Sequence, residues 1–332
     1  MKKNYYLFNP GRLSRKDNTL KFSPKDTNAD PKYLPVEGVD NLHVFGELDA
    51  NSSMYNFLGK NQIAVHFYDY YENYTGTFQP KQKLLAGRLL VKQAYYAQHK
   101  TKRLKLAVDI IKGASNNMTR VLKYYANRDK DVQESLQRIE NQLYSQIEVQ
   151  KDIPAVMGIE GNIRDSYYQA FNSIINDFEF TNRSKRPPKC PVNALISFGN
   201  MLCYSECIRA IYQTQLNPTI SFLHEPGERR FSLALDLAEI FKPILVDRMV
   251  FSVLNKKIVT QKDFDNRLNG IFLREAGKKK FISQWEEKLA STLKHPKLNK
   301  KVSYKSLIKM ECHKLVKHLM KIEDYEPFKA YW

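Results

Sequence analysis

The first 80 residues alternate short apolar runs with turn-forming residues, a pattern typical of β-strands. The runs are rich in Tyr, Phe, Val and Ile, and Asn, Gly, Pro and Asp separate them. They predict strands over residues 3–9, 19–23, 32–38, 41–47 and 62–71. Residues 50–61 predict one short helix that ends at Gly59, a residue type suited to a left-handed helix end. The pattern indicates a small, sandwich-like β domain over residues 1–81.

From about residue 82 the apolar residues recur at spacings of three and four, which indicates amphipathic helices. The helical runs are residues 81–100, 101–128, 131–149, 164–178, 192–212, 230–254 and 303–320. Pro154 ends the third run, and Pro187-Pro188 and residues 217–227 introduce turns. The predicted fold class is therefore α+β, with the β domain followed by a larger all-helical domain over residues 82–332.

The charge of the chain is concentrated in this second domain. The formal net charge is +18, of which residues 1–85 carry +2 and the remainder +16. Residues 274–321 alone hold 14 basic and 4 acidic side chains. A concentrated positive field favours a polyanionic partner, because phosphate binding releases condensed counterions. A solubilising Lys-rich surface is the alternative.

Membrane proteins and extracellular disulfide scaffolds are excluded as classes. No run approaches the roughly 18 apolar residues of a membrane span, and the basic runs lack the apolar face of a membrane-surface helix. The apolar stretch at the N-terminus ends at Asn9-Pro10, too early for a signal peptide, so we expect a cytoplasmic protein without a membrane partner. Cys203 and Cys207 lack the companion ligands of a zinc site, which favours buried thiols in a reducing compartment.

A glutamate between two glycines is the first candidate for chemistry. Glu160 lies between Gly158 and Gly161, after a proline and at the predicted start of a helix. Glycine lets the backbone approach a ligand closely. The alternative is a helix-start glutamate that interacts with the helix dipole.

Two further candidates follow in the sequence. His224 lies in a turn beside Pro226 and Gly227; taken alone, such a histidine is more often structural than a ligand. Asp236 and Glu239 are three residues apart in an apolar helical run, so they share a face. Burial of free carboxylates is costly, so they either hold a metal ion or pair with cations, with the following candidates: Arg229, Arg230 and Arg248.

Pro243 stands four residues after Glu239 and cannot donate to its carbonyl oxygen. We therefore expect the helix to kink there and to aim Glu239 into a cleft. One histidine with several carboxylates favours Mg²⁺ or Mn²⁺ over zinc. Such an ion in a basic domain suits displacement at phosphorus. No Walker loop, dinucleotide-binding GxGxxG or serine elbow is present, so nucleotide hydrolysis and hydride transfer have no support.

Several spaced motifs cover essentially the whole chain: residues 44–46, 156–162 with Arg164, 186–188, 191–199, 223–233 and 236–243. Their order resembles a known family, the CRISPR-associated integrase that is the larger protein of the spacer-acquisition pair. The sequence of residues 223–233 resembles the type I-B branch of that family.

This resemblance implies a site and a reaction. It implies a Mg²⁺ or Mn²⁺ site from Glu160, His224 and Glu239, with Asp236 in support. The reaction is transesterification, in which the 3′-hydroxyl of a short DNA fragment attacks a phosphodiester at the repeat of a CRISPR array; related members also cut branched DNA. Candidate DNA contacts are Arg164, Arg229, Arg230, Lys278, Lys279 and Lys280.

The resemblance also implies partners: double-stranded DNA, a second copy of the chain bound through the β domains, and a small dimeric adaptor protein. Two alternatives stay open. One is a structure-selective DNA repair nuclease that does not integrate. The other is a non-catalytic DNA-binding scaffold whose acids merely pair with arginines.

Overall fold

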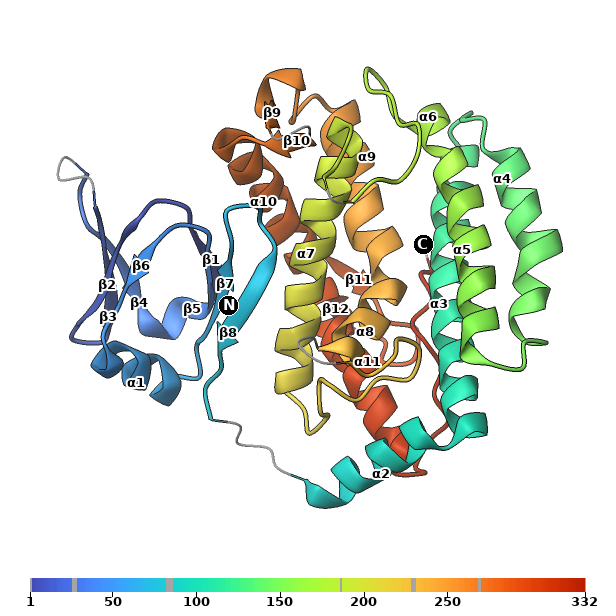
Figure 1. Ribbon diagram of the computed structural model, residues 1–332, viewed down its shortest axis with the longest axis horizontal. Helices are drawn as coiled ribbons and strands as arrows, with labels where there is room; N and C mark the ends of the chain where they lie inside the picture. Colours follow the sequence, from blue (N-terminus) through green and yellow to red (C-terminus); the bar gives the residue numbers. More distant parts are fainter. Residues whose placement is uncertain are drawn as a thin grey trace. The chain divides into compact units, whose positions relative to one another are not determined.

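The structure is a computed structural model that describes residues 2–25, 29–81, 86–185, 187–227, 231–267 and 270–331. The chain divides into two compact units, residues 1–83 and 84–332. The first consists mainly of strands and the second mainly of helices (Figure 1). The predicted α+β class is confirmed.

The first unit contains two four-stranded sheets. One has the order β1-β5-β7-β8, with β1, β5 and β7 parallel and β8 antiparallel; the other has the order β4-β3-β2-β6. The elements are β1 Lys3–Leu7, β2 Gly11–Lys16, β3 Thr19–Pro24, β4 Lys32–Pro35, η1 Val36–Gly38, β5 Val39–Val44, β6 Leu48–Asp49, α1 Ser52–Lys60, β7 Ala64–Tyr68 and β8 Tyr74–Phe78.

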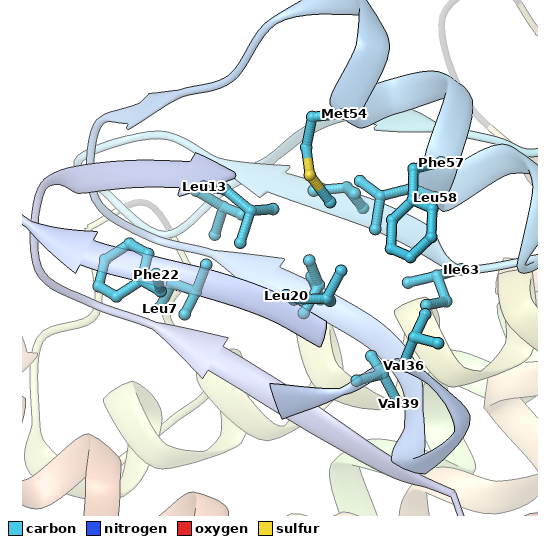
Figure 2. Close-up of a cluster of buried hydrophobic side chains, with 13 residues drawn as sticks. Leu7, Leu13, Leu20, Phe22, Val36, Val39, Met54, Phe57, Leu58 and Ile63 are labelled. Atoms are coloured by element: carbon cyan, nitrogen blue, oxygen red, sulfur yellow. The ribbon is translucent and has the colours of Figure 1, made fainter. Parts of the chain in front are cut away.

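One apolar core joins the two sheets and α1 (Figure 2). Leu13, Leu20 and Phe22 come from the second sheet, and Met54 and Phe57 come from α1. Burial of such side chains contributes about 1.5–3 kcal/mol each. The two sheets over a shared core form the predicted sandwich-like domain.

Local details of this unit differ from the sequence expectations. Gly59 lies inside α1, and Gln62 takes the left-handed backbone conformation instead, with φ 59°. Strand β2 was not predicted, because its alternate positions are Arg12, Ser14 and Lys16 and its single core residue is Leu13. Pairing with β3 fixes β2 as a strand.

The second unit is built around four adjacent helices. The 27-residue helix α3 packs against α5 and α8, and α8 packs against α7 (Figure 1). The elements are α2 Gly87–Gln98, α3 Lys100–Ala126, α4 Gln133–Gln137, η2 Arg138–Leu143, η3 Tyr144–Ile147, α5 Ile153–Gln169, α6 Phe171–Ile174, α7 Pro191–Tyr212, α8 Ser232–Lys242, η4 Pro243–Asp247, α9 Arg248–Asn255, η5 Gln261–Asp263, β9 Phe264–Arg267, β10 Gly270–Leu273, α10 Glu275–Ala290, β11 Thr292–Lys294, β12 Lys301–Ser303 and α11 Tyr304–Leu319.

The expectation of an all-helical second unit is corrected by two antiparallel hairpins, β9–β10 and β11–β12. Their strands are three or four residues long, too short to show a period of two against a Lys-rich background. Helix α10 was also not predicted. Among the described residues, no helix is long and apolar enough to span a bilayer.

At Pro243 the helix does not stop. It widens into the π-helical turn η4, in which the Arg248 N–H bonds to the Pro243 carbonyl oxygen five residues back, and continues as α9. A π-helical turn tolerates the missing N–H of proline.

Of the four thiols, Cys203, Cys207 and Cys312 are buried, as predicted, and burial raises the pKa of Cys207 well above its ordinary value.

Candidate active site

Glu160 lies in the middle of α5, not at a helix start. The helix begins earlier because Asp152 caps it, accepting the Ala155 N–H at 2.9 Å, and Pro154 occupies its first turn. The helix-dipole interpretation of Glu160 is therefore wrong. The neighbouring Gly158 and Gly161 have no atom within 4 Å of an added Cβ. No packing requires these two glycines, although each costs the helix about 1 kcal/mol relative to alanine.

A chain of ion pairs joins α5 to α8. Arg164 donates from Nε to Glu160 Oε1 at 2.5 Å and from Nη2 to Glu239 Oε2. Lys242 bonds the other oxygen of Glu239. Burial alone would raise the pKa of Glu239, but Lys242, Arg164 and His224 lower it to about 2. Glu239 is thus held as a buried carboxylate by surrounding positive charge.

Asp236 holds the loop that carries His224. Its carboxylate accepts the backbone N–H of Phe222 at 2.7 Å, of Leu223 at 3.0 Å and of His224 at 2.9 Å. It also lies 2.8 Å from Nδ1 of the His224 ring. With Nδ1 bonded to a carboxylate, Nε2 is the ring atom left to meet a ligand. Asp236 is fully buried and acts on the loop and the ring together.

The carbonyl groups of the same loop are held from α3. Arg103 donates to the Phe222 carbonyl oxygen at 2.9 Å and pairs with Glu225 at 2.8 Å. Ser221 donates its hydroxyl to the His224 carbonyl oxygen at 2.7 Å. The loop is therefore anchored through both its N–H and its C=O groups, which fixes the place of the imidazole.

A fourth carboxylate, Asp247, is buried close enough to Arg164 and Lys242 to feel their charges. It is 2 % exposed, and its buried Oδ2 has no hydrogen-bond partner among the described residues. Burial raises the pKa of Asp247 to about 7, against the opposing charges of Arg164, Lys242 and Arg183. Burial also lowers the pKa of Lys185, with Arg183, Lys242 and Arg164 as further causes. The charges of Arg164 and Lys242, which pair with Glu239, therefore act on both Asp247 and Lys185.

The predicted ligands partly converge. Glu160 and Glu239 meet on one guanidinium, and His224 is near enough for its charge to lower the pKa of Glu239. Two carboxylates and an oriented imidazole fit Mg²⁺ or Mn²⁺ in donor chemistry. Arg164 and Lys242 occupy those oxygens here. Within the described ranges, no three His, Cys, Asp or Glu side chains form a group that could hold a metal ion.

The ion-pair partners expected from the sequence are corrected. Glu239 pairs with Arg164 and Lys242, and not with Arg248. Arg164, expected at DNA, is engaged by two carboxylates. Arg229 and Arg230 lie outside the described residues.

The three predicted DNA-contact lysines of α10 have different surroundings. Lys280 bonds both oxygens of the buried Asp263, at 2.8 and 2.9 Å. Lys279 pairs with Glu275 one helical turn away. The contact of Lys278, Lys279 and Lys280 with DNA stays a prediction.

Sequence reasoning missed four residues of the site: Lys242, Arg103, Asp247 and Lys185. A signal existed for Lys242, because a cation three residues after Glu239 shares its helix face. Arg103 and Asp247 reach the site only through tertiary packing, and their positions in the sequence gave no indication.

The fold and the site define a class: a two-unit α+β protein whose helical unit carries a carboxylate–histidine site embedded in basic charge. Residues 5–287 match the family described as CRISPR associated protein Cas1. The chain belongs to this family.

Relatives and a solved structure agree over the full length. CRISPR-associated endonuclease Cas1 3 of Thermodesulfovibrio yellowstonii is 44% identical over 331 residues, which cover 99% of this chain and 100% of the relative. CRISPR-associated endonuclease Cas1 of Clostridium perfringens is 43% identical over 336 residues and 100% of both chains. The structure of a CAS1 protein from Thermotoga maritima matches with a TM-score of 0.86 and 38% identity, over 99% of this chain and 100% of that one.

Proposed function

We propose that this protein is a metal-dependent DNA endonuclease and integrase of CRISPR adaptation. The relatives named as endonucleases support this proposal over the full length of the chain. The observation that carries it is the convergence of Glu160 and Glu239 on Arg164, beside a His224 ring anchored by Asp236. A surface ion pair needs no such anchored imidazole.

The residues divide the work as follows. Glu160, His224 through Nε2, and Glu239 would hold Mg²⁺ or Mn²⁺. The ion would neutralise charge that develops on the phosphoryl oxygens and align the attacking hydroxyl. Asp236 keeps the imidazole oriented. Arg164 would give up Glu160 and Glu239 when the metal ion binds them. The positive charge of Lys185 favours a phosphate at the edge of the site.

The proposed reaction exchanges one phosphodiester for another. The 3′-oxygen of a DNA fragment forms a bond to phosphorus at the repeat, and the bond from that phosphorus to the original 3′-oxygen breaks. The proton lost by the attacking hydroxyl ends on the departing 3′-oxygen. With water in place of the hydroxyl, the same site cuts DNA. The partners are a double-stranded fragment and the CRISPR repeat.

The finer assignments rest on likeness to the family. They are a homodimer formed through the β unit, a small dimeric adaptor on which this homodimer docks, and the type I-B branch. The net charge of +2 on residues 1–85, against +16 on the remainder, leaves the β unit suited to protein contacts.

The decisive experiment supplies a short duplex, a supercoiled plasmid with a repeat, Mn²⁺ and the adaptor. Covalent joining of the duplex to the plasmid is expected for the wild type and is lost in His224→Ala. His313→Ala, a change at an exposed histidine of α11, is the matched control. Cleavage without joining would favour the repair nuclease. Equal reactions with Glu160→Ala, His224→Ala and Glu239→Ala would favour the non-catalytic scaffold.

A further inference from the structure

Two guanidinium groups lie against one aromatic ring, that of Tyr124. Arg128, just beyond the end of α3, has its Cζ 3.7 Å from the ring centroid of Tyr124, and Arg248, at the start of α9, has its Cζ 4.4 Å from it. Stacking holds a guanidinium plane in place and leaves its edge N–H donors available. One Arg128 donor bonds the Tyr124 carbonyl oxygen at 3.1 Å. This ring therefore holds two guanidinium groups side by side.

A third cation stands beside them. Lys288, near the end of α10, has its Nζ 4.3 Å from the ring centroid of Tyr304 at the start of α11. Burial, and after it the positive charge of Arg248, lowers the pKa of Lys288 to about 8. The charge of Arg248 also reaches Tyr304. Arg128, Arg248 and Lys288, with the rings of Tyr124 and Tyr304, are called the Tyr124 cluster below.

Two of the three cations of the cluster, Arg128 and Lys288, lack the ion pairs that nearby cations have. Among the described residues, neither of them forms an ion pair, and the Lys288 ammonium forms no hydrogen bond. Other lysines of the same segment do pair: Lys280 with Asp263, Lys297 with Glu326, Lys314 with Glu311 and Lys317 with Glu323. A desolvated ammonium beside a like charge costs free energy. Packing alone does not account for this arrangement, whereas an anionic ligand does.

The shape of the cluster favours phosphate over an acidic protein surface. A stable protein interface needs a desolvated apolar centre, but the exposed large apolar side chains in the described part of the chain belong to none of α3, α9, α10 and α11. Planar guanidinium forks and a lysine point charge suit the oxygens of successive phosphates.

We propose that the Tyr124 cluster binds the phosphate backbone of a DNA duplex, outside the phosphodiester that reacts. This inference rests on the proposed function and assigns that function a second DNA contact. The cluster positions the duplex and reads no base sequence.

The test measures the salt dependence of duplex binding. The triple variant Arg128→Gln, Arg248→Gln, Lys288→Gln removes three cations, so the slope of log K against log salt should fall by about 2–3. Affinity near 100 mM salt should fall about 10- to 100-fold on the same basis. The control triple variant removes three ion-paired surface cations: Lys25→Gln, Lys105→Gln and Lys257→Gln. It should change the slope by less than about 1.

An unchanged slope in the Tyr124-cluster variant, with normal binding and joining by the wild type, would overturn the cluster and leave the proposed function intact. A wild type that neither binds nor joins DNA would overturn the proposed function itself. Should the triple variant fail to fold, Lys288→Gln alone should still lower the slope by about 1.

Acylation of lysines in the full-length protein at pH 8 gives a second readout by mass spectrometry. Lys288 should react readily when free, and a duplex should protect it. Protection by the adaptor protein alone, with none by the duplex, would assign the cluster to a protein partner and overturn the inference.

Discussion

The candidate active site and the Tyr124 cluster are both basic, yet they balance charge in opposite ways. At the active site, Arg164 and Lys242 are matched by the carboxylates of Glu160 and Glu239. In the cluster, Arg128 and Lys288 form no ion pair within the described residues, and aromatic rings support them instead. Where side-chain cations hold carboxylates in place, a metal ion can take the place of those cations on the carboxylates. A region with surplus cations is suited to an anion.

The largest effect should come from the balanced region. Glu239→Gln removes one negative charge from the proposed site and replaces one of the two carboxylate oxygens by an amide nitrogen, which does not bind a metal ion. We expect joining and cleavage to fall at least about 100-fold, because several kcal/mol of transition-state stabilisation depend on the ion. The plasmid assay measures this change. Glu134→Gln, at an exposed glutamate of α4, is the control, and near-normal activity in Glu239→Gln would contradict the assigned site.

Removal of Arg164, the cation that Glu160 and Glu239 share, should lower the free energy of unfolding. Arg164→Met leaves the buried carboxylate of Glu239 and the partly buried carboxylate of Glu160 without their shared partner, which costs about 3–5 kcal/mol. Urea unfolding measures the loss, with Lys257→Met at an exposed ion pair as control.

The same Arg164→Met variant also tests for competition with the metal. Mn²⁺ should raise the melting temperature of the variant more than that of the wild type, because the guanidinium no longer competes for Glu160 and Glu239. An equal shift in both proteins would show that Arg164 does not have to leave.

Asp247 should make stability depend on pH. Its pKa is raised from 3.8 to about 7 in the folded protein, so the unfolded chain binds fewer protons between these values and stability falls as pH rises. Between pH 5 and 7 this loss amounts to about 2 kcal/mol. Glu239 acts oppositely: with a folded pKa of about 2, its contribution is lost only as pH falls below its ordinary value.

Asp247→Asn should therefore flatten the pH dependence of urea unfolding between pH 5 and 7. It should also make the protein more stable than the wild type at pH 8. A variant that keeps the wild-type slope would place the titration elsewhere.

The smallest effect is expected in the unbalanced region. Lys288→Met keeps the aliphatic packing on Tyr304 and removes a desolvated charge. Stability should stay unchanged or rise by up to about 1 kcal/mol. The comparison with Arg164→Met in the same unfolding assay is direct. A loss above about 2 kcal/mol would mean that the ammonium has a stabilising partner.

The sequence allowed prediction of features set by local pattern. The β domain, the long helices and the shared face of Asp236 and Glu239 follow from periods of two and of 3.6 residues. The partners of Glu239 could not be predicted, because Arg164 comes from a helix 75 residues away in the chain. In the same way, the sequence does not show that Lys280 has an ion-pair partner and Lys288 has none, because only tertiary packing decides which acidic side chain lies beside each lysine. The metal ion, the homodimer and the adaptor stay predictions.

The π-helical turn η4 acts as a phase shift between two halves of one helix. An α-helix advances about 100° per residue, and η4 accommodates one residue more than an α-helical turn would. Residues from Asp247 onward therefore face directions that an extrapolation of α8 would miss, with Asp247 near Tyr167 and Arg248 against Tyr124. Deletion of one residue from 244–246 would restore a regular helix and keep the side chains of α9 in their present directions, whereas deletion of one residue from the regular part of α8 would turn all of them by about 100°. In this stretch, the number of residues matters as much as their identity.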